Sequence, residues 1–139
     1  MSKIVAGFPG IGKSTFFKKF KGRVSDSDSS KFDKANFPEN YIKHIREEST
    51  KMDCVLVSSH KVVRDAMVDA AIPFTLIYPS VECKEEYLQR YKDRGSPQSF
   101  IDLLGKNWTA WIKECEEQKN CKKIVLKPGE FLADVLELK

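Results

Sequence analysis

Short apolar runs alternate with amphipathic stretches along this chain. Five of the runs predict β-strands, because each is short, apolar and followed by polar or turn residues. They cover Lys3–Gly7, Arg23–Asp26, Cys54–Ser58, Pro73–Tyr78 and Lys123–Leu126. The last three runs are almost continuously apolar, which predicts burial on both faces, as in a parallel sheet.

Between these runs, apolar residues recur every three or four positions, which predicts helices packed on the sheet. The expected helices cover Ser14–Phe20, Pro38–Thr50, Lys61–Ala71, Val81–Arg94, Pro97–Gln118 and Glu130–Leu138. We expect a break near Gly105, because glycine weakens a helix interior. Trp108 and Trp111 are three positions apart, a spacing typical of core packing.

The alternation of strands and helices predicts an α/β protein, built as a three-layer α/β/α sandwich. Right-handed crossovers would place the carboxyl ends of all parallel strands at one edge, where ligands bind. No linker, repeat or low-complexity tract divides the 139 residues, so we expect residues 1–139 to form a single domain.

Composition narrows the range of partners and compartments. The 24 basic and 20 acidic residues give a net charge of +4 that is spread along the chain, which suits a small anionic ligand better than nucleic acid. No apolar run approaches the ~18 residues of a membrane span, so we expect no membrane partner. The chain enters a strand without an apolar leader, and its four cysteines lack C-x-x-C spacing. We therefore expect a cytoplasmic protein with reduced thiols, as a monomer or homodimer.

Residues 7–14 read GFPGIGKS, the spacing of a phosphate-binding loop. The strand before it and the helix after it are the context that such a loop requires. Its glycines let main-chain N–H groups surround phosphate oxygens. Lys13 is expected to reach the β- and γ-phosphates of a nucleotide, and the Ser14 hydroxyl to ligate Mg²⁺. The expected nucleotide-binding residues here are Gly7, Pro9, Gly10, Ile11, Gly12, Lys13, Ser14 and Thr15.

The second expected strand runs into the sequence VSDSD, which places Asp26 and Asp28 at the ligand edge. Carboxylates at this spacing can hold the water shell of Mg²⁺ and accept a proton from a substrate hydroxyl. Aspartate is also common in turns and helix caps, so both interpretations stay open. Asp26 is the expected metal partner beside Ser14, and either aspartate can be the base.

The third expected strand ends in Ser58, Ser59 and His60, where a Walker B strand would end in aspartate. Asp53 precedes this strand and so lies at the wrong end for magnesium. Ser59 and His60 are expected to orient a ligand or cap the next helix, since a Ser–His pair has no evident carboxylate partner. Arg64, one turn later, faces either the same cleft or solvent.

Arg90 and Arg94 are four positions apart, which puts both guanidinium groups on one helix face. With Lys13 they would form a clamp around a transferring phosphoryl group. The alternative is an exposed charged face. A turn after the last strand is expected to contact the adenine through its backbone, and consists of Lys127, Pro128 and Gly129.

Together these motifs resemble the small P-loop kinases, a group that includes nucleoside and nucleotide kinases, shikimate kinase and gluconate kinase. GFPGIGKST (7–15) is specific for P-loop NTPases, VSDSD (24–28) resembles the segment after the second strand of shikimate kinase, and VSSHKVVRDAM (57–67) is similar to gluconate-kinase-like enzymes. KIVLKPGEFL (123–132) resembles the adenine-side loop. The resemblance implies an adenylate-kinase-like fold with strand order 2-3-1-4-5, an acceptor-binding helix region at 30–50 and a short lid at 90–105.

These features predict an enzyme that transfers the γ-phosphoryl group of ATP, with Mg²⁺, to a small acceptor, with a nucleoside or nucleotide preferred. The expected catalytic residues are Lys13, Asp26, Asp28, Arg90 and Arg94, and the expected acceptor-binding residues are Asp28, Ser59, His60 and Arg64. One alternative is a polynucleotide 5′-kinase, which shares the loop but needs a basic groove for its strand. Another is a non-catalytic module whose nucleotide state regulates a partner.

Overall fold

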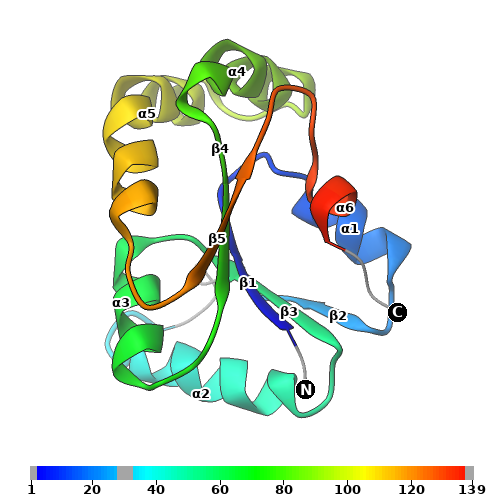
Figure 1. The fold of residues 1–139 in the computed structure, drawn as a ribbon, viewed down its shortest axis with the longest axis vertical. Coiled ribbons are helices and arrows are strands. Elements are labelled where there is room, and N and C mark those ends of the chain that lie inside the picture. Colours follow the sequence, from blue (N-terminus) through cyan, green and yellow to red (C-terminus); the bar gives the residue numbers. More distant parts are fainter. Residues whose placement is uncertain (1–2, 28–32, 137–139) are drawn as a thin grey trace.

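The computed structural model describes residues 3–27 and 33–136, and within them it forms one five-stranded, all-parallel β-sheet (Figure 1). The strand order is β2-β3-β1-β4-β5, which confirms the expected α/β class and topology. The strands are β1 (Lys3–Gly7), β2 (Val24–Asp26), β3 (Cys54–Ser58), β4 (Thr75–Pro79) and β5 (Lys122–Leu126).

Helices cover both faces of this sheet (Figure 1). One face carries α1 (Lys13–Lys19) and α6 (Leu132–Val135), and the other carries α3 (Lys61–Asp69) and α5 (Gln98–Glu117). The remaining helices are α2 (Glu39–Ser49), which packs against β3 and α3, the short 3-10 helix η2 (Val81–Cys83), and α4 (Lys84–Asp93), which packs against α5. The layers therefore agree with the expected sandwich.

The three central strands are buried on both faces, as the apolar runs of β3 and β4 predict. Val5 of β1, Leu56 of β3 and Leu76 of β4 are each at most 1% exposed. The same prediction is wrong for β5, where Lys122 and Lys123 are exposed and Val125 is 45% exposed. The reason is position: β5 is an edge strand and has a neighbouring strand on one side alone.

Two helix predictions also need correction. The expected break near Gly105 is wrong, because α5 is continuous through it. A Cβ atom at Gly105 would lie 3.6 Å from Leu88 Cδ1 of α4, so the glycine lies where α4 and α5 pack closely. The last helix is shorter than expected, spanning Leu132–Val135, and residues 137 and 138 of the expected range lie outside the described residues.

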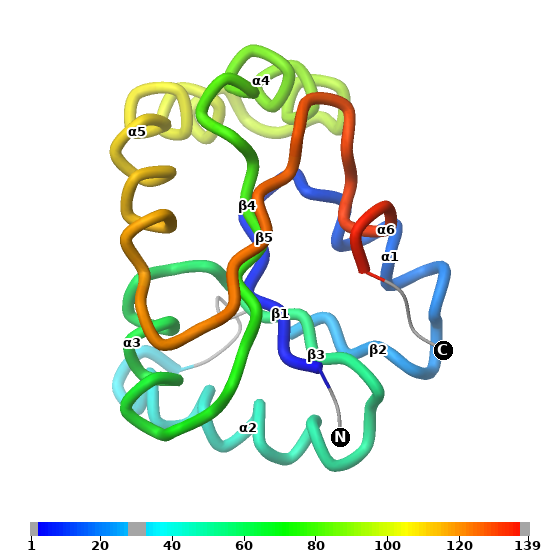
Figure 2. The backbone as a smooth tube through the Cα atoms, viewed as in Figure 1, coloured from blue at the N-terminus to red at the C-terminus, as the bar shows by residue number. Residues whose placement is uncertain are grey.

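The strand register brings the expected site to one edge of the sheet. Gly7 at the end of β1 pairs with Ser58, the last residue of β3, and with Ile77 of β4, so β1 and β3 end level and β4 continues to Pro79. Figure 2 shows the chain after β5 turning at this edge and running back beside α1 to α6. Among residues 3–27 and 33–136, none of the helices has the length and apolar character that crossing a membrane requires.

Candidate nucleotide and phosphoryl-transfer site

A cavity of about 800 Å³ opens above the phosphate loop at this edge, a size within the ~300–1,000 Å³ typical of ligand sites. It brings together ten of the residues predicted from the sequence. They are Pro9, Gly10, Gly12, Lys13, Ser14, Thr15, Asp26, His60, Arg90 and Arg94. Residues distant in sequence thus meet around one cavity, as the strand-end argument predicts.

The other predicted residues lie elsewhere. Ile11 is fully buried in the core, and Gly7 lies beneath the loop. Ser59 and Arg64 line a second, smaller cavity, which they share with His60. The turn at 127–129 does not line the large cavity. Asp28 lies outside the described residues, so its role stays a prediction.

The phosphate loop has the backbone that its glycines permit. Gly10 and Gly12 have φ angles of +91° and +98°, a region that side chains disfavour. Gly12 is the N-cap of α1, and Phe16 N–H donates to its carbonyl at 3.0 Å. The Lys13 ammonium donates to Gly7 O at 3.0 Å, which holds it over the loop. Gly10, Gly12, Lys13 and Ser14 of the loop therefore line one cavity.

Arg90 and Phe131 line one side of the cavity, and the fully buried Tyr87 and Tyr91 lie behind it; we call these four residues the α4 wall. The loop rests directly on it: a Cβ at Gly10 would lie 2.8 Å from Tyr91 Cε1 and 3.1 Å from Tyr87 Cδ2. The Tyr91 hydroxyl donates to Pro9 O at 2.8 Å. This hydrogen bond fixes the loop against α4. The two tyrosine rings leave room only for glycine at position 10 unless they shift.

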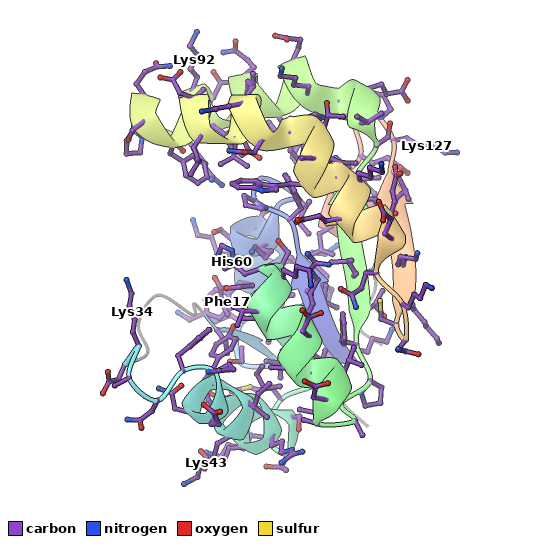
Figure 3. The ribbon with its side chains drawn as sticks, turned by 90° about the vertical axis from the view of Figure 1, so that its left-hand side faces the viewer. Phe17, Lys34, Lys43, His60, Lys92 and Lys127 are labelled. Carbon is purple, nitrogen blue, oxygen red and sulfur yellow. The ribbon has the colours of Figure 1, made fainter. Side chains whose placement is uncertain are left out.

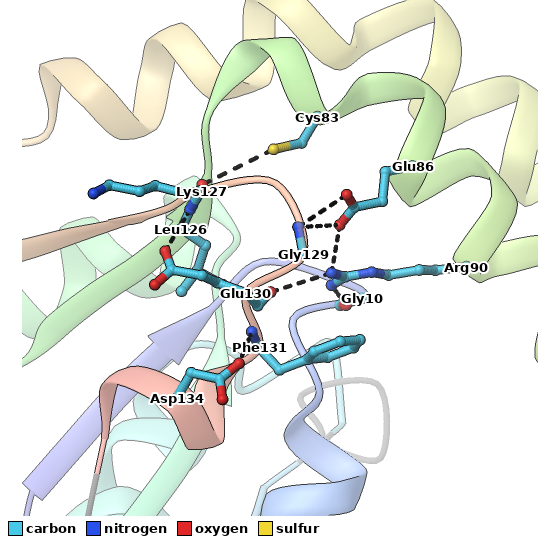
Figure 4. Close-up of polar contacts among 10 residues, drawn as sticks. All are labelled: Gly10, Cys83, Glu86, Arg90, Leu126, Lys127, Gly129, Glu130, Phe131 and Asp134. Atoms are coloured by element: carbon cyan, nitrogen blue, oxygen red, sulfur yellow. Dashed lines mark hydrogen bonds and ion pairs between the residues drawn. The ribbon is translucent and has the colours of Figure 1, made fainter.

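Arg90 joins three segments within this wall (Figure 4). Its Nη1 donates to Gly10 O at 2.8 Å, and its Nη2 donates to Glu86 Oε2 at 2.6 Å and to Glu130 O at 3.1 Å. The guanidinium also lies over the rings of Tyr87 and Phe131, at 4.2 and 3.9 Å from their centroids. These contacts favour a positioning role for Arg90 over the direct phosphate contact expected from the sequence.

The turn after β5 is tied to the same wall (Figure 4). The Gly129 N–H donates to both carboxylate oxygens of Glu86, at 3.0 and 3.1 Å, and the Lys127 N–H donates to Glu130 Oε1 at 2.7 Å. Beyond the turn, the Phe131 ring covers Gly12, where a Cβ would lie 3.2 Å from Phe131 Cδ1. Glu86 and Arg90 thus form one network that holds this turn beside the phosphate loop.

Arg94 differs from Arg90 although it lies one turn later. It is the C-cap of α4 and is exposed, with Nε donating to Ser96 Oγ at 3.0 Å and the guanidinium over the Tyr91 ring at 5.0 Å. The expected lid, residues 90–105, therefore consists of the end of α4, a connection at 94–97 and the first turns of α5. Of the two arginines, Arg94 is the better placed to meet a phosphoryl group in the cavity.

The opposite side, which we call the β2–β3 wall, consists of Asp26, Ser27, Ser58 and His60. Tyr41 of α2 joins its two strands from behind, because its hydroxyl donates to Ser27 O at 2.6 Å and accepts from Ser58 N–H at 3.3 Å. The expected acceptor region, 30–50, thus contributes α2 to the support of this wall. Asp26 itself is exposed to the cavity at the end of β2.

A bound magnesium nucleotide fits these residues. In the described parts of the chain, no three His, Cys, Asp or Glu side chains gather into a metal site of their own. Magnesium held on nucleotide phosphates needs only one or two further protein ligands, because it keeps several waters. The Ser14 hydroxyl and the Asp26 carboxylate line the same cavity and supply that oxygen chemistry. Asp53 lies at the far end of β3, as its position predicts, and it pairs with Arg23 at 2.7 Å.

The end of β3 and the start of α3 lead into the second cavity. His60 occupies the N-cap position of α3 without a side-chain capping bond, and it lines both cavities. Figure 3 shows it at the upper end of α3, below the layer formed by α4 and α5. Arg64 is buried rather than solvent-exposed: its Nε donates to Ser59 O at 2.8 Å and its Nη1 to Gln118 Oε1 at 2.6 Å.

Burial controls the ionisation of the groups around the site. It raises the pKa of Tyr87 to about 12, although the nearby Arg90 charge opposes the shift, and it also raises the pKa of Tyr91. Burial raises the pKa of the Cys115 thiol, in the second cavity, to about 11. These phenols and this thiol are neutral at pH 7, so the charges at the site come from Lys13, the arginines and the carboxylates.

Sequence reasoning missed several residues of the site. Phe131, Phe100 and Ser27 line the large cavity, and Tyr41 supports it from behind. Phe131 lies two positions after Gly129, the last residue of the predicted turn, so its place near that turn was a usable signal. The spacing of Tyr41 predicts that its ring packs in the core. It does not indicate that its hydroxyl hydrogen-bonds to the backbone of Ser27 and Ser58.

Comparison of the sequence with protein-family models and with curated proteins found no match.

Proposed function

We propose that this chain is an ATP-dependent phosphotransferase that moves the γ-phosphoryl group of ATP to a small acceptor, a nucleoside or nucleotide. One observation carries the proposal: the phosphate loop with Lys13 and Ser14 faces Asp26 and Arg94 across a single cavity. A loop that only held a nucleotide would need Lys13 and Ser14 but neither Asp26 nor Arg94. The second pair supplies a carboxylate and a cation where a transferring group would lie.

In the proposed reaction, the bond from the γ-phosphorus to the bridging oxygen breaks as a bond to the acceptor oxygen forms, and ADP leaves with the electron pair. Lys13 and Arg94 stabilise the negative charge on the transferring group. Magnesium bound with the nucleotide supplies further positive charge on the phosphate oxygens. If the acceptor is a hydroxyl, its proton passes to a carboxylate, for which Asp26 is the candidate among the described residues; a phosphate acceptor carries no proton that must leave.

A panel assay tests this proposal. The protein is incubated with magnesium and γ-³²P-labelled ATP together with nucleosides, nucleoside monophosphates, shikimate, gluconate or DNA 5′ ends, and ADP binding is measured in parallel. We expect label transfer to one of the nucleosides or monophosphates. ADP binding without any label transfer would overturn the enzyme and favour the regulatory module, and no ADP binding would overturn the phosphate-loop assignment itself.

A further inference from the structure

We propose that the cavity between α3 and α5 holds the base of the acceptor, and that Arg64 selects bases that carry a ring carbonyl group. This inference rests on the proposed function, because it concerns the acceptor of the same reaction. It names a site for the acceptor base and predicts that thymine, uracil, guanine and cytosine are accepted before adenine.

The position of this cavity fits an acceptor. It shares the wall residues Pro9, His60 and Phe100 with the phosphate-loop cavity, so the two spaces adjoin. A molecule with its base in the smaller cavity therefore extends past His60 toward Lys13 and Asp26. This orientation carries the reactive end of the acceptor to the place where the phosphoryl group arrives.

The size and lining of the cavity fit a flat ring. Its volume is about 270 Å³, just below the ~300–1,000 Å³ typical of sites for whole drug-sized ligands. Its walls are largely apolar, and the aromatic and aliphatic side chains among them are Phe8, Phe100, Leu103, Leu104 and Trp111. Aromatic walls favour stacked rings. We infer that one ring system enters the cavity and that the sugar stays at its mouth.

The polar groups of the cavity decide which ring it accepts. The Arg64 side chain is only 4% exposed, and its Nε and Nη1 already donate to protein acceptors. Among the described residues, its Nη2 pairs with Glu114 Oε2 alone, at 3.9 Å, which is beyond hydrogen-bond distance. A buried guanidinium with an unused donor is best matched by a carbonyl oxygen, which adenine lacks. Glu114 beside it can accept a ring N–H.

This arrangement also has a kinetic advantage for the proposed enzyme. The donor nucleotide carries adenine, and an acceptor cavity that disfavours adenine stays open when ATP is abundant. A site that hydrogen-bonds a ligand group discriminates against analogues without it more strongly than an apolar pocket does. One hydrogen bond to a charged group corresponds to about 1.5–3 kcal/mol, or roughly a 10- to 100-fold difference in affinity.

The test measures binding and transfer on variants that close the cavity. Leu103 lines it but is 50% exposed, so Leu103→Trp can cover the opening without disturbing the core. Val62→Trp is the matched control, because Val62 is also 50% exposed and lies on α3 outside the cavity lining. Thymidine, uridine, guanosine, cytidine and adenosine are titrated by calorimetry, and ADP is titrated on every variant as a check of the phosphate loop.

We expect the nucleosides with a ring carbonyl to bind at least tenfold more tightly than adenosine. Leu103→Trp should weaken their binding and slow phosphoryl transfer to them at least tenfold, whereas Val62→Trp should not, and ADP affinity should stay unchanged in both. Equal binding of adenosine, or transfer to an acceptor that Leu103→Trp does not affect, would overturn this inference and leave the phosphotransferase standing. ADP binding with no acceptor labelled at all would overturn both.

Glu114→Gln provides a second, milder measurement, because the amide keeps the shape of the side chain. Glu117→Gln on the same helix is its control, since Glu117 is exposed and lies outside the cavity. We expect Glu114→Gln alone to change the ratio of guanosine to cytidine affinity. An identical ratio in both variants would remove Glu114 from the selection and contradict its part in the proposal.

Discussion

The two walls of the phosphate-loop cavity are built in different ways. In the α4 wall, Arg90 and Tyr91 donate hydrogen bonds to carbonyls of the loop itself, and the tyrosine rings fill the space behind Gly10. In the β2–β3 wall, the support comes from Tyr41 behind the strands, and Asp26 is exposed to the cavity. The side that holds the phosphate loop is thus fixed by the fold, whereas the other side presents its polar groups to the cavity.

We expect this difference to separate residues that hold the loop from residues that act in the proposed phosphoryl transfer. Substitutions in the α4 wall should change the stability of the protein and its affinity for nucleotide together. Substitutions of the exposed residues should change turnover and leave stability intact. The following variants test this separation.

The largest effect is expected for Lys13→Ala. It removes the cation nearest the phosphates and should lower kcat/KM by roughly 10²–10³-fold, the range seen when one preorganised donor to a transition state is lost. Steady-state kinetics with the labelled acceptor measure this loss. Lys18→Ala, on the exposed side of the same helix, is the control and should retain full activity. Comparable activity in the two variants would contradict the role of the loop.

Asp26→Asn should follow, with a decrease in kcat of about a hundredfold. The amide keeps the shape of the carboxylate but loses its charge and its basicity. ADP affinity and the thermal midpoint should stay near those of the unmodified protein, because the side chain is exposed. Asp69→Asn, an exposed aspartate at the end of α3, serves as control. A lowered thermal midpoint without loss of kcat would place Asp26 among the structural residues instead.

Gly10→Ala tests the contact between the loop and the α4 wall. Gly95→Ala is its matched control, because both glycines have positive φ angles, +91° and +80°, but nothing lies within 4 Å of a Cβ at Gly95. Gly95→Ala should cost about 1–2 kcal/mol of unfolding free energy from backbone strain. Gly10→Ala should cost about 1–3 kcal/mol more, from overpacking against Tyr91, and should weaken ADP binding. Urea unfolding measures the free energies and calorimetry measures ADP affinity. Equal losses of unfolding free energy in the two variants would show that the α4 wall shifts to accommodate the added methyl group.

Arg90→Lys and Arg94→Lys compare the two arginines directly. A lysine at 90 lacks the planar set of donors with which the guanidinium reaches Gly10 O, Glu86 and Glu130 O. The unfolding free energy should therefore fall by about 1–2 kcal/mol. A lysine at 94 should lower kcat about tenfold with little change in stability. The reverse pattern, with Arg90→Lys stable and catalytically impaired, would restore the clamp role that the sequence predicts for Arg90.

The smallest effect is expected for Tyr87→Phe. Within the described residues the Tyr87 hydroxyl is buried without a hydrogen-bond partner, so its removal should leave the unfolding free energy at pH 7 unchanged or slightly higher. Tyr91→Phe should instead lose about 1 kcal/mol, because its hydroxyl bonds to Pro9 O.

The same phenols predict the alkaline behaviour of the α4 wall. Because the pKa of Tyr87 is raised from 10.0 to about 12 in the folded protein, the unfolded chain loses this proton first as the pH rises. The ionisation of this phenol therefore does not change the free energy of unfolding below pH 10, and it lowers that free energy between about pH 10 and pH 12. Urea midpoints over this range should fall less steeply for Tyr87→Phe than for the unmodified protein, and identical slopes would contradict the assignment.

The sheet could be predicted well from the sequence because local signals agree with one another. The bounds of β1 and β3 match the expected ranges, since each apolar run ends directly in glycine or serine. The role of Arg90 could not be predicted in this way. Its spacing to Arg94 shows which residues share a helix face, but Gly10 O lies 80 positions away in sequence and is brought there by the fold. The burial of Arg64 by Gln118, 54 positions away, has the same origin.

The exposed edge of β5 has a consequence for the behaviour of the protein at high concentration. An unpaired strand edge is a template on which a second molecule can add a strand, and charged side chains discourage such addition. In β5 the exposed Lys122 and Lys123 precede the apolar segment Ile-Val-Leu at 124–126. Replacing both lysines with apolar residues would leave a continuous uncharged strand at the edge, the pattern typical of segments that aggregate. These two side chains are exposed and lie away from both cavities, so we expect them to discourage association of molecules through this edge of the sheet.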